Sequence, residues 1–164
     1  MKTIAGVLAA LLLAYAAPGM ADEAIPPSLS ELMAQPSYQQ SWKQALQGEK
    51  DLPSWVRSGQ GTSTPPQTLT WQDQAYQVGL ICQPHNCGNR QVFIAFSGDR
   101  RQAWALRVTL PDSDAAMLHP SKHVHFQWLG NPDASLKTLL MKQVTSQPGW
   151  KWRVSRVRCR CISE

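Results

Sequence analysis

The chain has 164 residues, four cysteines, seven tryptophans and a formal net charge of +5. This length suits one domain with a substantial hydrophobic core. The sequence contains no G-x-S-x-G, phosphate-binding loop or H-E-x-x-H motif, so it lacks the common signatures of serine hydrolases, nucleotide-binding proteins and zinc proteases.

The first 21 residues have the three parts of a secretory signal peptide. Lys2 gives the positive start, residues 4–17 form the apolar segment, and Gly19-Met20-Ala21 matches a small-x-small cleavage site. The apolar segment is too short to span a membrane, and no later segment predicts a span. We therefore expect residues 1–21 to be removed from an exported protein. Cysteines of exported proteins usually form disulfides.

Two helices are predicted at the start of the mature chain. Ser28 and Glu31 match a capping box, as do Ser37 and Gln40, and Pro36 separates the two helices. The second box opens a helix whose apolar residues share one face. That face comprises Tyr38, Trp42, Ala45 and Leu46. The following segment is rich in turn residues, apart from a short helical turn predicted at 54–57.

From residue 67 the apolar period changes to two. Large apolar residues recur at even-numbered positions in 76–82, 92–96 and 104–110. This pattern predicts neighbouring antiparallel strands with one buried face. Residues 126–129 predict a further strand.

A helix is predicted after the last strand. Asn131-Pro132-Asp133 indicates its N-cap and first turn, and Pro148-Gly149 ends it. Its expected buried stripe comprises Leu136, Leu139, Leu140 and Val144. The order of helices, strands and a helix predicts an α+β fold, with one domain over residues 22–150 in which helices flank an antiparallel β-sheet.

The last segment, residues 151–164, carries five basic residues and one acidic residue, whereas residues 22–150 carry ten of each. A basic tail is typical of contact with nucleic acid, anionic lipid or an acidic polymer, and also of a solvated chain end. Export argues against nucleic acid. Cys159 and Cys161 lie too close along one strand to pair comfortably, which leaves an intermolecular disulfide or a strained ring. The role of this tail stays open.

The loop CQPHNC, residues 82–87, lies at the tip of a predicted hairpin. A disulfide between its ends is reasonable if the two Cα atoms approach to about 5.5 Å. It would add roughly 2 kcal/mol of stability and remove most of the loop's own freedom. Pro84 fixes one more backbone angle, and Asn86 can bond back to the loop backbone. His85 is therefore predicted to project from a stiff loop, which binds a partner at a small entropic cost.

The same residue types also occur in other kinds of site. Cys82 and Cys87 could form a metal site with His123 and His125, which would share a strand face, although C-x4-C is wider than the usual zinc spacing. Four intervening residues are too many for a C-x-x-C redox pair. A nucleophilic dyad with His85 needs a free thiolate, which export disfavours. A purely structural disulfide beside an idle histidine is the remaining alternative.

The sequence resembles the periplasmic inhibitors of vertebrate (c-type) lysozyme, the Ivy-like family of Gram-negative bacteria. The similarity covers most of the mature chain. It is strongest at LPSWV (52–56), at TPPQTLTWQDQAYQVGLICQPHNCG (64–88) and in the strand that follows. The signature of the family is a disulfide-closed loop with Pro-His at its centre. Here that loop consists of Cys82, Gln83, Pro84, His85, Asn86 and Cys87.

The resemblance implies a periplasmic inhibitor of c-type lysozyme, and not an enzyme, that needs no cofactor or metal. Its loop would plug the lysozyme cleft, with His85 against the catalytic carboxylates, and the protein would form a homodimer. A regulator of the bacterium's own lytic transglycosylases and a periplasmic Cys/His metal-binding protein are the alternatives. The family's commonest loop has Lys where Gln83 stands and Asp where Asn86 stands, so a direct lysine contact is absent here.

Overall fold

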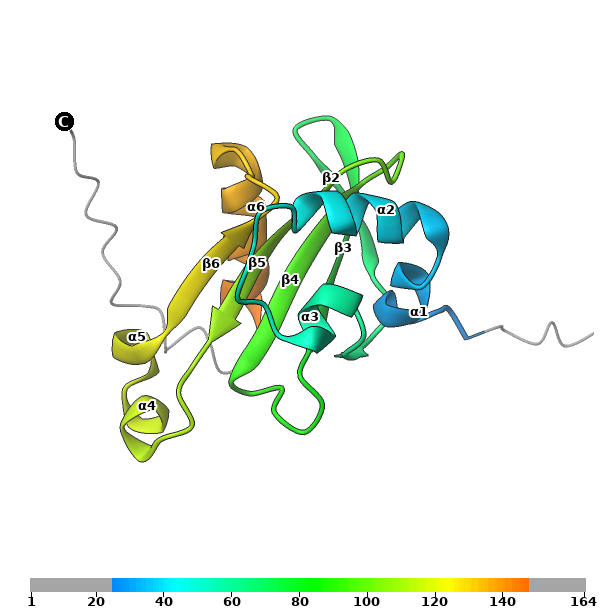
Figure 1. The fold of residues 1–164 in the computed structure, drawn as a ribbon. Coiled ribbons are helices and arrows are strands. Elements are labelled where there is room, and N and C mark those ends of the chain that lie inside the picture. Colours follow the sequence, from blue (N-terminus) through cyan, green and yellow to red (C-terminus); the bar gives the residue numbers. More distant parts are fainter. Residues whose placement is uncertain (1–24, 148–164) are drawn as a thin grey trace, which may run out of the picture.

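A six-stranded antiparallel sheet forms the centre of the computed structural model, which describes residues 25–147 (Figure 1). The predicted signal peptide and the basic tail with Cys159 and Cys161 lie outside the described residues. Between residues 25 and 147, no helix is long and apolar enough to cross a membrane.

Three helices precede the sheet: α1 (Leu29–Met33), α2 (Pro36–Ala45) and α3 (Ser54–Ser58). The capping box of Ser28 and Glu31 is confirmed. The second predicted box is wrong, because Gln35 is the N-cap of α2 and Pro36 is its first residue, which places Ser37 inside the helix. The predicted apolar face of α2 is buried as expected.

The strands are β1 (Thr62–Ser63), β2 (Gln67–Trp71), β3 (Gln74–Cys82), β4 (Arg90–Ser97), β5 (Ala103–Thr109) and β6 (His125–Leu129). Their order is β1-β3-β4-β5-β6, and β2 also pairs with β3. Gln72 and Asp73 join β2 to β3, both with positive φ, as a type I′ hairpin turn requires. The sequence pattern did not separate β1 and β2 from β3.

The sheet is buried on both faces, so the prediction of one buried face is wrong. Phe93 of β4 pairs with Leu106 of β5, and Val92 pairs with Arg107. Even positions of β4 therefore share a face with odd positions of β5. One core, between the sheet and α1–α3, includes Val92, Ile94 and Phe96. The other core, between the sheet and α6, includes Phe93, Leu106 and Val108.

Helix α6 (Ala134–Ser146) covers the face of the sheet opposite α1–α3 (Figure 1). Its N-cap is Asp133, whose side chain accepts a 2.8 Å hydrogen bond from the backbone N–H of Leu136, so the helix begins two residues later than predicted. The predicted buried stripe is confirmed. Two short helices that the sequence did not predict, α4 (Asp114–Leu118) and α5 (Pro120–His123), lie between β5 and β6.

Candidate functional site

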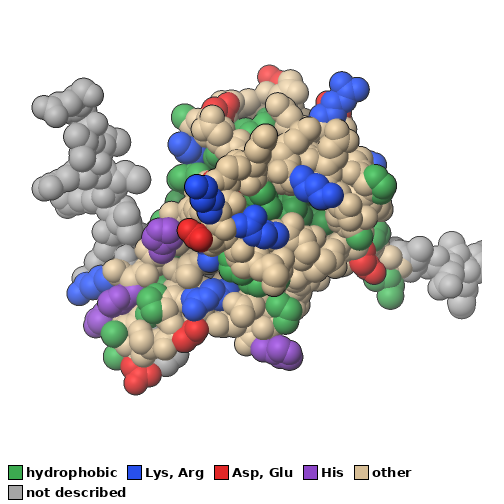
Figure 2. Space-filling view, in the orientation of Figure 1, with side chains coloured by type: hydrophobic (Ala, Val, Ile, Leu, Met, Phe, Trp, Pro, Cys, Tyr) green, Lys and Arg blue, Asp and Glu red, His purple; other side chains and the backbone are tan. Residues whose placement is uncertain are grey.

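The loop between β3 and β4 leaves the sheet at the end where α4 also lies (Figure 1). A disulfide joins Cys82, the last residue of β3, to Cys87, and the two Cα atoms are 4.9 Å apart. The two cysteines therefore close the loop as predicted. In the space-filling view, a histidine side chain projects from this end of the molecule, apart from the other histidines on that face (Figure 2).

The tip of the loop is a tight turn. The backbone N–H of Asn86 donates a 3.0 Å hydrogen bond to the carbonyl oxygen of Gln83. Pro84 and His85 occupy the two central positions, and the φ angle of His85 is +64°. Proline followed by a residue of positive φ is the signature of a type II turn, whose third position favours glycine. Here that position holds an exposed histidine.

Backbone hydrogen bonds also fix the second half of the loop. The carbonyl oxygen of Asn86 accepts from the backbone N–H groups of Asn89 and Arg90, at 3.2 and 3.0 Å. The backbone N–H of Gln83 donates to the carbonyl oxygen of Arg90 at 3.0 Å. These bonds tie both halves of the loop to the start of β4.

Asp112, in the segment after β5, anchors the loop from outside. Its carboxylate accepts hydrogen bonds from the side-chain amides of Asn86 (3.1 Å) and Asn89 (2.8 Å), and it pairs with Arg90 at 3.0 Å. These contacts hold the pKa of Asp112 below its ordinary value, chiefly through the Asn89 and Asn86 bonds. The predicted bond from the Asn86 side chain back to the loop backbone is not formed. The side chain bonds instead to Asp112, which no local pattern in the sequence indicates.

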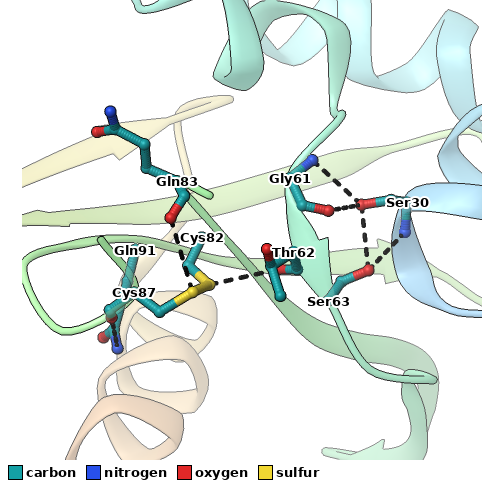
Figure 3. The surroundings of a disulfide bond; sticks show 8 residues. All are labelled: Ser30, Gly61, Thr62, Ser63, Cys82, Gln83, Cys87 and Gln91. Atoms are coloured by element: carbon teal, nitrogen blue, oxygen red, sulfur yellow. Dashed lines mark hydrogen bonds between the residues drawn. A yellow bond between two sulfur atoms is a disulfide. The ribbon is translucent and has the colours of Figure 1, made fainter. Parts of the chain in front are cut away.

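The base of the loop is packed against β1 (Figure 3). The Sγ atom of Cys82 lies 3.4 Å from the carbonyl oxygen of Thr62. A side chain at Gly61 would place its Cβ 2.5 Å from the carbonyl oxygen of Cys82, so only glycine fits this approach. The hydroxyl of Ser30 in α1 donates to the carbonyl oxygen of Gly61 at 2.7 Å. Helix α1 therefore holds the strand that supports the disulfide.

Gln91, at the start of β4, supports the other side of the disulfide (Figure 3). Its side-chain Nε2 donates a 2.7 Å hydrogen bond to the carbonyl oxygen of Cys87. Its Oε1 is buried and has no hydrogen-bond partner among the described residues. The sequence does not indicate this contact with Cys87, because a glutamine in a strand usually faces solvent.

The arrangement does not support the metal-site alternative. Cys82 and Cys87 are bonded to each other and cannot serve as thiolate ligands. His123 ends α5 and His125 begins β6, so the prediction that they share a strand face is wrong. Across residues 25–147, no group of three or more His, Cys, Asp or Glu side chains is arranged to hold a metal ion.

Comparison with known proteins places the chain in a family. A family model described as inhibitor of vertebrate lysozyme (Ivy) matches residues 37–146. The chain belongs to this family. It is an inhibitor family and not an enzyme family, as the sequence resemblance implied.

Individual relatives agree with this assignment. An inhibitor of vertebrate lysozyme from Pseudomonas aeruginosa is 41% identical over 136 residues, which cover 82% of this chain and 88% of the relative. An uncharacterised protein of Yersinia pestis is 42% identical over 125 residues, or 76% of this chain and 81% of the relative. The inhibitor of vertebrate lysozyme from Escherichia coli K12 is 36% identical over 85 residues, about half of each chain.

Proposed function

We propose that this Ivy-family protein inhibits c-type lysozyme by inserting the loop of residues 82–87 into the active-site cleft, with His85 at the tip. The observation that carries the proposal is the placement of an exposed histidine on a turn closed by the Cys82–Cys87 disulfide. A loop already held in its bound shape loses little conformational entropy on binding. Family membership supplies the target class.

An imidazole suits the chemistry of the target. The lysozyme cleft holds two carboxyl groups, one protonated in an apolar pocket and one ionised. A neutral imidazole can donate to the ionised carboxylate and accept from the protonated acid, whereas an imidazolium can donate to both. In either state His85 would occupy the space that the sugar ring and the attacking water need. Inhibition would then rest on occlusion and charge-assisted hydrogen bonds, without any reaction on the inhibitor.

Gln83 and Asn86 replace the charged residues that the sequence resemblance led us to expect. The side-chain amide of Asn86 donates a hydrogen bond to Asp112. An ionised aspartate at position 86 could not donate this bond. Gln83 is half-buried, and its carbonyl oxygen accepts the turn-closing hydrogen bond. We infer that both residues hold the loop in shape and that His85 supplies most of the direct contact with the target.

The test is the rate of cell-wall lysis by a vertebrate lysozyme in the presence of increasing amounts of the chain from residue 22 onward. We expect stoichiometric inhibition, which a Cys82→Ser/Cys87→Ser variant that is still folded by circular dichroism should largely lose. Lytic transglycosylases are assayed in parallel. Full lysozyme activity at a large excess of inhibitor, together with inhibition of a transglycosylase, would transfer the function to that alternative target.

Location and assembly form part of the proposal. We infer that residues 1–21 direct export and are cleaved, so that the inhibitor meets lysozyme in the periplasm. Mass spectrometry of protein released from the periplasm tests the cleavage after Ala21. We also infer a homodimer from family membership, and light scattering of the mature chain tests it.

A further inference from the structure

Helix α6 leaves the sheet partly uncovered on both of its sides. It packs against β4 and β5, whose outer neighbours in the sheet are β3 and β6. Trp71 of β2, which pairs with β3, also reaches α6, because its indole N–H donates a 2.8 Å hydrogen bond to the hydroxyl of Ser135. The side chains of Trp71 in β2 and Trp128 in β6 are only half-buried. Other partly buried apolar side chains of this face are Leu69, Tyr76, Leu80, Trp104, Phe126 and Met141. We call this surface the α6 face.

Two lysines of α6 lie over these tryptophans. The Nζ atom of Lys137 is 5.8 Å from the ring centroid of Trp128, and that of Lys142 is 5.6 Å from the ring centroid of Trp71. Both lysines are exposed. Helix α6 itself contains no Asp or Glu. The nearest acidic residue in sequence, Asp133, lies at its N-terminal end, so positive charge dominates the middle of the helix.

A shallow, open groove lies between α6 and β6 on this surface. It has a volume of about 470 Å³ and is lined mostly by carbon atoms of Trp128, Lys137, Thr138, Met141, Lys142 and Thr145. Ammonium groups at the rim of an apolar groove suit a partner that presents negative charge outside and hydrocarbon beneath.

We propose that the α6 face binds the surface of an anionic lipid bilayer. Tryptophan and lysine together are characteristic of the membrane interface, where the indole enters the headgroup region and the ammonium group meets phosphate. An acidic polymer would pair with the lysines but would not cover the exposed parts of the tryptophan rings. A second copy of this face in a two-fold pair would bring the lysines of both copies together, which like-charge repulsion disfavours.

The chain that follows α6 has a matching composition. Residues 148–164 contain Trp150, Trp152 and five basic residues. Each basic residue near an anionic surface raises the binding constant roughly fivefold. This segment therefore contains the same residue types as the α6 face.

Binding through the α6 face would leave the inhibitory loop accessible. The loop lies at one end of the sheet, whereas α6 covers one of its faces (Figure 1). A membrane-bound molecule could then still present His85 to lysozyme. Only this consequence rests on the proposed function; the lipid binding is independent of it.

The experiment is co-sedimentation of the chain from residue 22 onward with vesicles, without lysozyme. One set of vesicles contains phosphatidylcholine alone, and the other contains equal parts of phosphatidylcholine and phosphatidylglycerol. We expect binding to the anionic vesicles only. Lys137→Gln/Lys142→Gln should lower the apparent affinity roughly 30-fold, as the loss of two interfacial charges predicts. The matched control is Lys43→Gln/Lys50→Gln, which removes two exposed lysines outside this face and should retain most of the binding.

Five outcomes would overturn the proposal. Absence of binding, or equal binding to both kinds of vesicle, would remove the anionic bilayer as the partner. An equal loss of vesicle affinity in the two double-lysine variants would show that net charge alone causes the binding. Binding to polyglutamate as tight as that to vesicles would indicate an acidic polymer. Self-association without lipid that Trp128→Ala abolishes would assign the face to a second copy. A second pair of variants tests the tryptophans. Trp128→Ala should weaken binding to anionic vesicles, whereas the control Trp55→Ala, on the other side of the sheet, should not.

Discussion

The side-chain amide of Asn86 donates a 3.1 Å hydrogen bond to the carboxylate of Asp112, a residue 26 positions later in the chain. The disulfide closes the loop, but this contact, with those from Asn89 and Arg90, fixes the loop relative to the sheet. The orientation of His85 therefore depends on two constraints, one inside the loop and one outside it.

The external constraint predicts a functional role for Asp112. Asp112→Ala should weaken lysozyme inhibition several-fold, because it removes the exposed hydrogen bonds that tie Asn86 and Asn89 to the segment after β5. Inhibition titrations at neutral pH measure the effect. Asp114→Ala is the control, because Asp114 is also exposed and has no described bond to the loop. Equal inhibition by the two variants would contradict the anchoring role.

An exchange of donor and acceptor tests the contact itself. Asn86→Asp alone places two carboxylates at hydrogen-bond distance, so repulsion should loosen the loop and weaken inhibition. Adding Asp112→Asn restores a donor opposite an acceptor and should recover part of the lost inhibition. A double variant no better than the sum of the single variants would show that the two side chains act independently.

The lowered pKa of Asp112 sets a pH window. Its ordinary value is 3.8, and the bonds from Asn89 and Asn86 stabilise the ionised form. Ionisation in the folded state therefore adds stability above the unfolded pKa, and this stability is lost as pH falls through the folded pKa. The stability difference between the parent and Asp112→Asn should stay constant above about pH 5 and shrink in more acid solution. Unfolding midpoints over this pH range measure the stability difference. A difference that grows on acidification would contradict a lowered pKa for Asp112.

The positive φ of His85 separates its function from its contribution to stability. His85→Ala should reduce inhibition by about 2 kcal/mol or more, close to 30-fold, as expected for a central contact residue. His85→Gly should lose inhibition equally but leave the free energy of unfolding within about 1 kcal/mol of the parent, since glycine adopts this φ without strain. Urea unfolding and lysis assays on both variants give the two numbers. Retained inhibition in His85→Ala would remove His85 from the interface.

The second core predicts a large effect at an odd-numbered position of β4. Phe93 is 1% exposed and packs with α6. Phe93→Ala should destabilise the fold by about 3–5 kcal/mol, as for a buried aromatic in a well-packed core. A sheet with one buried face would predict almost no change at this position. Chemical denaturation distinguishes the two, with exposed Gln39→Ala as the surface control.

Local signals in the sequence determined much of the architecture. Alternation of apolar residues predicted the central strands, the i, i+4 spacing of Tyr38 and Trp42 predicted α2, and the stripe ending at Val144 predicted α6. These features depend on neighbouring residues and on burial of one side of an element, so the sequence states them directly. The closed loop with Pro84 and His85 at its tip was likewise predictable, because its cysteines and its turn lie within six residues.

Tertiary structure decided the rest. The pairing of Val92 with Arg107, and not with a residue of the predicted apolar face, follows from the register between strands, which the parity of one strand does not fix. The support of the loop by Asp112, Gly61 and Ser30 brings together residues far apart in the chain. Such contacts depend on how the strands pair and how the helices pack on the sheet. The sequence by itself therefore determined which residue stands at the tip, and the packing of distant segments decided how rigidly that residue is held.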